Sequence, residues 1–279
     1  MLLREHIALA VEKKTALGHF NISNLEGFWA VVNVAKNLNL PVIIGVSEGE
    51  RDFLGIKQIK ALVDSVKAEG LPVFLNADHT YSLERIKEVV DAGYDSVIID
   101  EAEKSFEENL RITKEAVAYA KAKEVLVEAE LGFIGKSSKL LDEIPEGVSK
   151  TTVEEARKFV EETGIDLFAP AVGNVHGMLK SGLEPKLDIE LIKQIKEAVR
   201  IPLVLHGASG NSDEEIKEAI SAGISIIHIN TELRVAYRKG LIKSLQDNPD
   251  EIAPYKYLRP ALKEMESVIE KKLKLFNNL

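Results

Sequence analysis

Short, continuously apolar runs alternate along the chain with longer stretches in which apolar residues recur every three or four positions. The runs are rich in Val, Ile, Leu and Phe, lack polar alternation and are too short for helices. Strands that are buried on both faces of a parallel sheet have this character. The pattern predicts eight strands: Ala16–Asn21, Pro41–Val46, Pro72–Ala77, Ser96–Asp100, Val125–Glu130, Asp166–Ala171, Ile201–His206 and Ile224–Ile229.

The stretches between these strands have the spacing of amphipathic helices. Leu83, Ile86, Val89 and Val90, for example, fall on one face of a helix that can pack on a sheet. Gly93 follows this segment at a position where glycine commonly ends a helix. The same reasoning predicts helices over Asp52–Glu69, Ser82–Asp91, Phe106–Ala122, Thr152–Thr163, Leu187–Val199 and Asp213–Ala222.

Eightfold alternation of strand and helix is typical of the (β/α)8 or TIM barrel, an α/β fold that the length also suits. An open, doubly wound sheet is the alternative. No stretch rich in Pro, Gly or Ser divides the chain, so we expect one domain over residues 1–279. The segment from Tyr255 to Phe276 is predicted to form an additional C-terminal helix.

The composition narrows the range of possible functions. With 36 basic and 45 acidic residues, the net charge of −9 gives no electrostatic reason to bind nucleic acid or an anionic membrane. The absence of cysteine excludes disulfides, thiolate metal sites and cysteine nucleophiles. The first residues lack the apolar core of a signal peptide and no apolar run is long enough to span a membrane, so we expect a cytoplasmic protein.

Three histidines fall at the carboxyl ends of predicted strands, where barrel enzymes carry their chemistry. His79 follows the third strand, His176 follows the sixth and His206 ends the seventh. The strand ends of a closed barrel form a ring, so these residues can face one point. Three imidazoles with an open fourth position are typical of a catalytic zinc site. The alternative is that three unrelated histidines happen to end strands.

Carboxylates accompany the histidines. Asp78 precedes His79 and is a candidate general acid/base, or alternatively a partner of a metal ligand or a cap for the following helix. Asp100 ends the fourth strand, and Glu130 lies on the fifth. Buried carboxylates need a cation or hydrogen-bond donors, so Asp100 and Glu130 could hold a second metal ion. Salt bridges inside the barrel would satisfy them equally well.

Two turns suggest an anion site. Gly207, Ala208 and Ser209 follow the seventh strand, while Asn230 and Thr231 follow the eighth and open a helix. Backbone amides and hydroxyl groups after these two strands commonly bind phosphate in barrels, and Gly177 could add an amide. Taken alone, however, the Gly-Ala-Ser-Gly sequence is more often only a turn.

Two motifs point to other chemistry. Residues 45–49 match the Gly-x-Ser-x-Gly nucleophile elbow, which makes a serine hydrolase acting through Ser47 the rival hypothesis. That hypothesis leaves the three histidines unexplained, so Ser47 is better interpreted as a ligand contact at the barrel mouth. Residues 132–137 resemble a phosphate-binding loop but have the wrong glycine spacing. The predicted strands contain no lysine for a Schiff base.

Several motifs occur in the order and at the intervals typical of one known family. They are Asn-Ala-Asp-His at 76–79, Glu-Ala-Glu-Leu-Gly at 128–132, Asn-Val-His-Gly at 174–177, Leu-Val-Leu-His-Gly-Ala-Ser-Gly at 203–210 and Asn-Thr-Glu-Leu at 230–233. Together they resemble the class II, metal-dependent ketose-bisphosphate aldolases, the family of fructose- and tagatose-bisphosphate aldolases. The resemblance spans almost the whole chain.

The resemblance implies zinc on His79, His176 and His206, and Asp78 as the acid/base at the C4 hydroxyl group of the substrate. It also implies a second divalent-ion site at Asp100 and Glu130. The C1 phosphate of the ketose would be bound with the help of a monovalent cation (Na+ or K+), near Ser47 and against Gly177, Gly207, Ala208, Ser209, Asn230 and Thr231.

The chain departs from the family pattern in three places. A family loop usually supplies a glutamate for proton exchange at C3, but residues 136–138 are Lys, Ser and Ser, and the nearest acids are Asp142, Glu143 and Glu146. His228 stands where an asparagine usually contacts the substrate, and Ile226 replaces a lysine. Near the C-terminus, Lys256 or Arg259 would have to replace an arginine that reaches the distal phosphate.

The resemblance therefore predicts a zinc-dependent aldolase that splits a ketose 1,6-bisphosphate, with fructose preferred over tagatose only because it is commoner. The expected partners are a small sugar phosphate and further copies of the chain, in a dimer or tetramer. A barrel that binds sugar phosphates without catalysis is the alternative, because the loop glutamate is missing.

Overall fold

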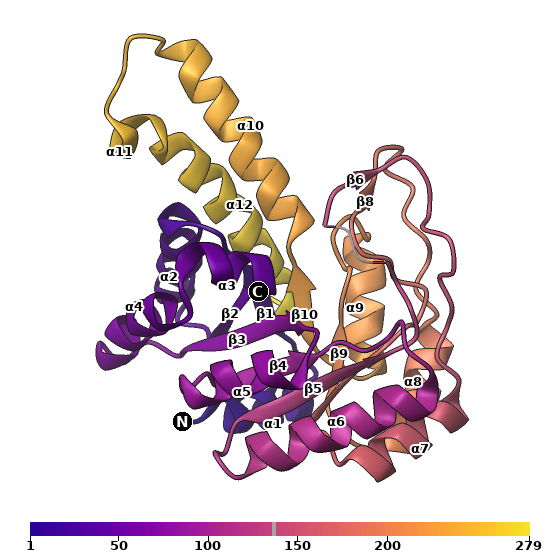
Figure 1. Cartoon of the computed structure of the whole chain (residues 1–279). Coiled ribbons are helices and arrows are strands. Elements are labelled where there is room, and N and C mark those ends of the chain that lie inside the picture. Colours follow the sequence, from indigo (N-terminus) through magenta and orange to yellow (C-terminus); the bar gives the residue numbers. More distant parts are fainter. Residues whose placement is uncertain (136–137) are drawn as a thin grey trace.

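The fold is a closed barrel of parallel strands wrapped by helices (Figure 1), as a computed structural model describes it for residues 1–135 and 138–279. Around the barrel the strand order is β1-β10-β9-β7-β5-β4-β3-β2, which confirms the predicted (β/α)8 fold and excludes an open sheet. Each predicted apolar run overlaps one barrel strand. The bounds are β1 (Leu17–Asn21), β2 (Val42–Val46), β3 (Val73–Thr80), β4 (Ser96–Ile99), β5 (Leu126–Leu131), β7 (Leu167–Pro170), β9 (Leu203–Leu205) and β10 (Ile224–Ile229).

Helices follow the strands and bury their apolar faces against the barrel. The predicted helix Asp52–Glu69 is in fact two, α3 (Glu48–Leu54) and α4 (Ile56–Ala68), because Gly55 adopts a φ of +85° that ends the first. The other helices around the barrel are α2 (Leu25–Leu38), α5 (Leu83–Asp91), α6 (Phe106–Lys121), α7 (Val153–Thr163), α8 (Ile189–Val199), α9 (Asp213–Ala222) and α10 (Thr231–Asp247).

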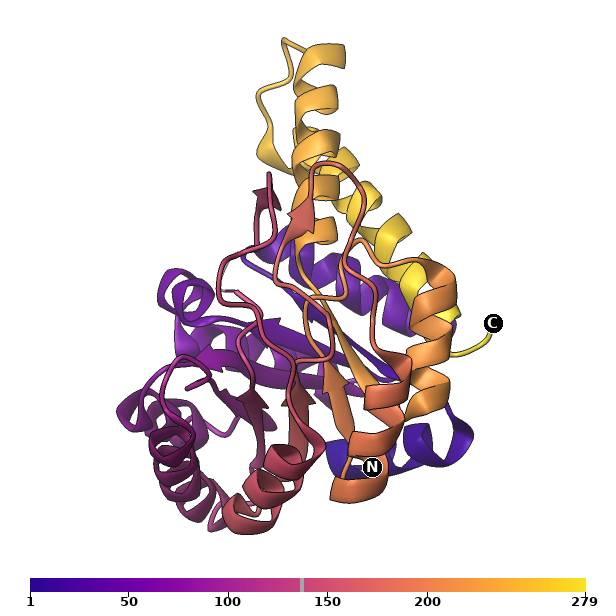
Figure 2. The ribbon, with the colours of Figure 1, turned by 90° about the vertical axis from the view of Figure 1, so that its right-hand side faces the viewer.

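The amino-terminal end of the barrel is closed by a helix that the sequence analysis did not predict, α1 (Leu3–Lys13). Figure 2 shows it in indigo at the lower end of the barrel. Leu3, Ile7 and Ala10 lie on one face of α1 and are buried. They pack with side chains from the barrel interior: Leu17, Ile43, Phe74, Leu126, Leu167, Ala169, Val204 and Ile226.

The chain ends in the predicted additional helix, α12 (Arg259–Phe276), which forms a hairpin with α10 (Figure 1). The short helix α11 (Pro254–Tyr257) lies at the far tip of this hairpin, so the expected continuous helix from Tyr255 is interrupted near Leu258. The other end of α12 is anchored in the core by Leu273 and Phe276.

A small second sheet lies at the opposite end of the barrel from α1 (Figure 1), and the sequence did not predict it. Its strands are β6 (Leu140–Leu141) and β8 (Met178–Leu179), joined in parallel. It holds the segments that contain Ser138 and Gly177 side by side above the barrel mouth. In the described part of the chain, no helix is both long enough and apolar enough to cross a bilayer.

Candidate metal and active site

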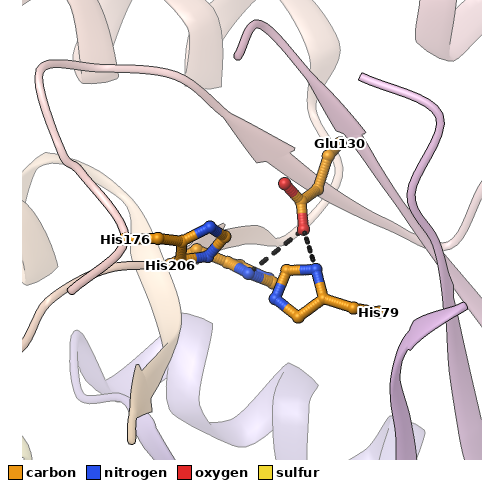
Figure 3. Close-up of side chains that lie close together, drawn as sticks. All are labelled: His79, Glu130, His176 and His206. Carbon is orange, nitrogen blue, oxygen red and sulfur yellow. Dashed lines mark ion pairs between the residues drawn. The ribbon is translucent and has the colours of Figure 1, made fainter. Parts of the chain in front are cut away.

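The three histidines predicted to share an ion come together at the carboxyl end of the barrel (Figure 3). His79 lies near the end of β3, His176 in the loop after β7 and His206 directly after β9. Their ring centroids are 4.8 to 5.7 Å apart. Glu130 of β5 joins them, and one ligand atom from each of the four residues lies within 4.8 Å of the others.

Each ring is held by a partner outside this cluster. His176 Nδ1 lies 2.7 Å from the carbonyl oxygen of Gly135, and His206 Nε2 lies 2.6 Å from Glu128 Oε1. The Nδ1 atom of His79 lies 2.8 Å from Asp100 Oδ2. Partners of this kind fix the orientation of metal-binding histidines.

Electrostatics favours a cation here. Burial lowers the pKa of His79, but the carboxylates of Asp78 and Glu130 outweigh this effect and raise it well above 6.5. The negative charges therefore attract positive charge to this point. Burial, with the nearby His79 and His206, lowers the pKa of His176 to about 3, so its ring is in the neutral form that can bind a metal.

Two buried atoms in the cluster lack a hydrogen-bond partner among the described residues: Glu130 Oε1 and His206 Nδ1. They lie 3.2 Å apart, and His79 Nδ1 is 3.1 Å from the same carboxylate oxygen. A divalent cation that binds Glu130 Oε1 and His206 Nδ1 would satisfy both atoms. The residues therefore fit a transition metal ion such as zinc.

Asp100 and Glu130, expected to form a second ion site, both lie against His79. Because Glu130 also belongs to the histidine cluster, a second ion would have to share that carboxylate with the first. Burial raises the pKa of Glu130, and the charge of Asp100 raises it further. The two carboxylates would hold both of their charges most readily next to a cation.

Asp78 lies beside the cluster and is almost completely buried, with 2% of its surface exposed. Its Oδ2 atom accepts a hydrogen bond of 2.7 Å from Asn21 Nδ2, and His228 Nδ1 is 3.5 Å from its Oδ1 atom. Burial raises the pKa of Asp78, but His79 and His228 lower it to well below the usual value. The carboxylate is thus ionised and able to accept a proton. The alternative capping role is wrong, because Ser82 caps α5.

His228 faces the same pocket and is held in a stack of imidazoles. Its ring is stacked on that of His19 at 3.4 Å, and the ring of His206 lies on its other side at 3.9 Å. Nothing in the sequence indicated a role for His19. Room for its ring depends on Gly45, where a Cβ atom would lie 2.0 Å from the His19 ring.

The residues predicted to bind phosphate meet next to the histidines. Gly177, Gly207, Ser209, Asn230 and Thr231 line one pocket with Asp78 and the three histidines. The amino terminus of α10 begins at Thr231, so its free amides and positive helix dipole face this pocket. Ala208 is buried and is not among the residues that line this pocket.

Ser47 lies farther out, in a neighbouring cavity of about 450 Å³ that also contains His79, Tyr81 and Arg234. Its hydroxyl group donates a hydrogen bond of 2.9 Å to Glu50 Oε2. Glu50 Oε1 in turn pairs with Arg234 at 2.7 Å. A serine nucleophile needs an adjacent base such as histidine, and the described contacts of Ser47 do not include one, which argues against the serine hydrolase.

Other candidates lie elsewhere. Lys256 and Arg259 line a groove along the α10–α12 hairpin and are not among the residues that line either cavity of the site.

In the loop that lacks the expected glutamate, Lys136 and Ser137 lie outside the described residues. Ser138 lines both cavities, whereas the alternative acids are occupied or remote: Asp142 pairs with Lys180, and Glu143 and Glu146 are exposed.

Sequence reasoning missed several polar residues that support the site. Asn21 contacts Asp78, and Asn174 donates a hydrogen bond of 2.9 Å to the carbonyl oxygen of His206. Asn174 belongs to the Asn-Val-His-Gly motif that carried the family resemblance, but nothing in the spacing of either residue indicated a partner. The position of Asn21 at the end of a predicted strand was the only available signal.

Comparisons with known proteins agree with this geometry. The family model for class II fructose-bisphosphate aldolase matches residues 2–279. A fructose-bisphosphate aldolase of Geobacillus stearothermophilus is 38% identical over 281 residues, covering 99% of this chain and 96% of that protein. The crystal structure of the YdjI aldolase from Escherichia coli K12 matches with a TM-score of 0.82 and 34% identity, covering 99% of this chain and 97% of that one.

The fructose-bisphosphate aldolase of Campylobacter jejuni has the same fold, with a TM-score of 0.85 at 25% identity over 99% of this chain and 94% of that one. The likeness to these enzymes extends through the barrel and the α10–α12 hairpin, since it covers nearly the whole chain. The chain therefore belongs to the class II fructose-bisphosphate aldolase family and is an aldolase, a carbon–carbon lyase.

Proposed function

We propose that this aldolase is zinc-dependent and reversibly cleaves fructose 1,6-bisphosphate to dihydroxyacetone phosphate and glyceraldehyde 3-phosphate. The observation that carries the proposal is the convergence of His79, His176 and His206 beside the ionised Asp78 and the anion pocket. The names of the relatives support fructose bisphosphate as the substrate. Tagatose bisphosphate, which differs only in stereochemistry, is the alternative.

The pocket has two halves with different roles: the three histidines with Asp78 form one, and the anion site forms the other. A zinc ion held by the three histidines supplies Lewis acidity to the ketose carbonyl when it is bound. Asp78 accepts the proton of the C4 hydroxyl group as the C3–C4 bond breaks, and returns it in the direction of condensation. Asn21 holds the Asp78 carboxylate in place through its hydrogen bond.

Binding of the C1 phosphate is assigned to the other half. The amides at Gly177 and Gly207, the hydroxyl groups of Ser209 and Thr231, and the amino terminus of α10 suit a phosphate dianion. A monovalent cation and a second divalent ion at Asp100 and Glu130 are part of the proposal. His228 lies between the two halves, where it would contact the carbons that react.

The test is formation of glyceraldehyde 3-phosphate from fructose 1,6-bisphosphate by the zinc-loaded protein. We expect turnover that a chelator abolishes and added zinc restores. A parallel assay with tagatose 1,6-bisphosphate compares kcat/KM for the two sugars. If the protein binds zinc and sugar phosphate but turns over neither sugar, the non-catalytic binding barrel is the correct interpretation.

We further propose that the chain forms a homo-oligomer, a dimer or a tetramer. The α10–α12 hairpin projects beyond the barrel (Figure 1) and carries exposed apolar side chains, among them Val235, Ile242, Leu245, Ile252 and Tyr255. Apolar surface of this kind is typical of contacts between subunits. Sedimentation equilibrium tests this, and a monomer at micromolar concentration would contradict it.

A further inference from the structure

Arg51 is an arginine with none of its surface exposed, and it lies directly behind the site on α3. Its Nη1 atom donates hydrogen bonds to the carbonyl oxygens of Val46, at 2.5 Å, and Asp78, at 2.9 Å. Its Nη2 atom donates one of 3.1 Å to Thr80 Oγ1. None of the ion pairs found within the described residues involves Arg51, so this buried guanidinium binds neutral acceptors on the ends of β2 and β3.

These acceptors surround an irregularity in β3. Ala77 pairs with Val97 of β4, but the next pairing joins Thr80 to Ile99, so β3 contains one extra residue at this point. His79, within the irregularity, has a φ of +39°, in the left-handed region that side chains other than glycine rarely adopt. The strand therefore has a β-bulge at Asp78 and His79.

The bulge is what brings both residues into the site. Consecutive side chains of a regular strand point to opposite faces, so an unbroken β3 would direct Asp78 or His79 away from the pocket. Both instead line it. The positions of the proton acceptor and of the metal ligand thus both depend on this bulge.

Arg51 spans this bulge. Its two terminal nitrogens bind the Asp78 carbonyl group inside the bulge and the Thr80 side chain just after it, while the bond to Val46 ties both to β2. The planar guanidinium fixes the relative positions of its acceptors, which a flexible ammonium group cannot do.

Glu50, the residue before Arg51 on α3, helps to hold the side chain of Asp78. Glu50 Oε2 accepts a hydrogen bond of 3.0 Å from Asn21 Nδ2, the same nitrogen that donates to Asp78 Oδ2. Helix α3 thus controls the backbone of Asp78 through Arg51 and its carboxylate through Glu50 and Asn21.

We propose that Arg51 is a positioning residue, which holds the β3 bulge so that Asp78 and His79 face the site together. The inference rests on the proposed function for the roles of these two residues. It predicts that loss of the guanidinium impairs proton transfer and metal binding at once, without touching the phosphate pocket.

The first test compares Arg51→Met and Arg51→Lys with the wild-type protein. We expect Arg51→Met to lower both kcat and zinc affinity by roughly 10- to 100-fold, the usual range for residues that support metal ligands, with KM changed less than twofold. Arg51→Lys keeps the positive charge but not the planar guanidinium, so kcat and zinc affinity should fall less than in Arg51→Met. Cobalt(II) provides a readout besides activity, because its visible spectrum reports the geometry of the histidine ligands.

Tyr94→Phe is the matched control. This buried tyrosine donates a hydrogen bond of 3.2 Å to the carbonyl oxygen of Ile56 on α4, close to Arg51 but away from the bulge. The change should leave kcat, the cobalt spectrum and zinc affinity unaltered.

An Arg51→Met protein that melts cooperatively and keeps wild-type kcat and metal affinity would overturn the proposal. If that variant does not fold, Arg51→Lys and Thr80→Val decide. The first keeps the positive charge but loses the planar guanidinium, and the second removes only the hydrogen bond to Thr80 Oγ1. Wild-type kcat and metal affinity in both would equally refute it. If the wild-type protein does not cleave the ketose, the proposed function fails, but the change in cobalt spectrum and metal affinity still tests Arg51.

Discussion

The two ends of the barrel are built from opposite kinds of residue. At the amino-terminal end, Leu3, Ile7 and Ala10 of α1 close the interior with apolar side chains. At the carboxyl end, the interior is filled by imidazoles and carboxylates, of which Asp78, Glu128 and Glu130 have at most 3% of their surface exposed. The apolar end can only stabilise the fold, whereas the polar end can perform chemistry.

The contrast has an energetic basis. Burial of apolar surface at α1 is favourable without any ligand. Burial of several carboxylates costs free energy unless a cation or hydrogen-bond donors compensate. Substitutions at the carboxyl end should therefore affect activity and metal binding, while those at the amino-terminal end should affect stability alone.

The largest effect is expected for His206→Ala at the carboxyl end. Loss of a ligand should remove zinc, and a Lewis acid worth several kcal/mol corresponds to a fall in kcat of about 10³- to 10⁴-fold. The fold should persist, as far-ultraviolet circular dichroism can show. Wild-type activity together with full metal content would contradict the assignment of this ligand.

Asp78→Ala separates the proton acceptor from the metal. We expect kcat for cleavage to fall by about 10²- to 10⁴-fold, the usual contribution of a general acid or base, while zinc content stays at the wild-type level. Asp78→Asn, which preserves shape but not charge, should behave in the same way. Unchanged turnover in either variant would remove the proposed role.

Ile7→Ala is the matching change at the other end of the barrel. A cavity between α1 and the barrel interior should lower the free energy of unfolding by about 2–5 kcal/mol, with kcat unaffected at temperatures where the protein is folded. Denaturant unfolding measures this. Val11→Ala, on the exposed side of the same helix, should cost less than about 0.5 kcal/mol. A lowered kcat in the folded Ile7→Ala protein would show that the ends are coupled.

Zinc itself should stabilise the fold through the carboxyl end only. At a free concentration 100 times its Kd, the ion should raise the free energy of unfolding by about 2.7 kcal/mol. Ile7→Ala should retain this increase in full and His206→Ala should lose it, as thermal melts with zinc and with a chelator can show. Equal stabilisation of the two variants would place the bound zinc outside the histidine cluster.

The barrel was predictable because buried parallel strands appear in the sequence as short, continuously apolar runs, as in residues 41–46 and 224–229. Helix α1 was not predicted although Leu3, Ile7 and Ala10 have helical spacing. Three apolar positions are too few to predict a helix by themselves, and the barrel interior that they cover is known only from the structure. The break between α3 and α4 depends on the positive φ of Gly55, which a helical pattern on both sides conceals.

The site was predictable as a set of residue types at strand ends, but not in its internal geometry. Strict alternation along β3 would have separated Asp78 from His79, and nothing in the sequence indicates the bulge that joins them. The packing of His19 on His228 joins β1 to β10, and the Arg51 contacts join α3 to β3. Such contacts between distant segments are set by closure of the barrel rather than by local spacing.

The smallest effect is expected for Ser209→Ala in the anion pocket. Loss of one hydroxyl donor to a phosphate should raise KM for the ketose about tenfold and leave kcat within a factor of two, because this contact is the same in substrate and transition state. Ser225→Ala is the control: its buried hydroxyl group donates to the carbonyl oxygen of Leu203 near the amino-terminal end of the barrel. That change should cost about 1 kcal/mol of stability and leave KM unaltered. If Ser209→Ala left KM unchanged while Ser225→Ala raised it, the division of labour between the two ends would be wrong.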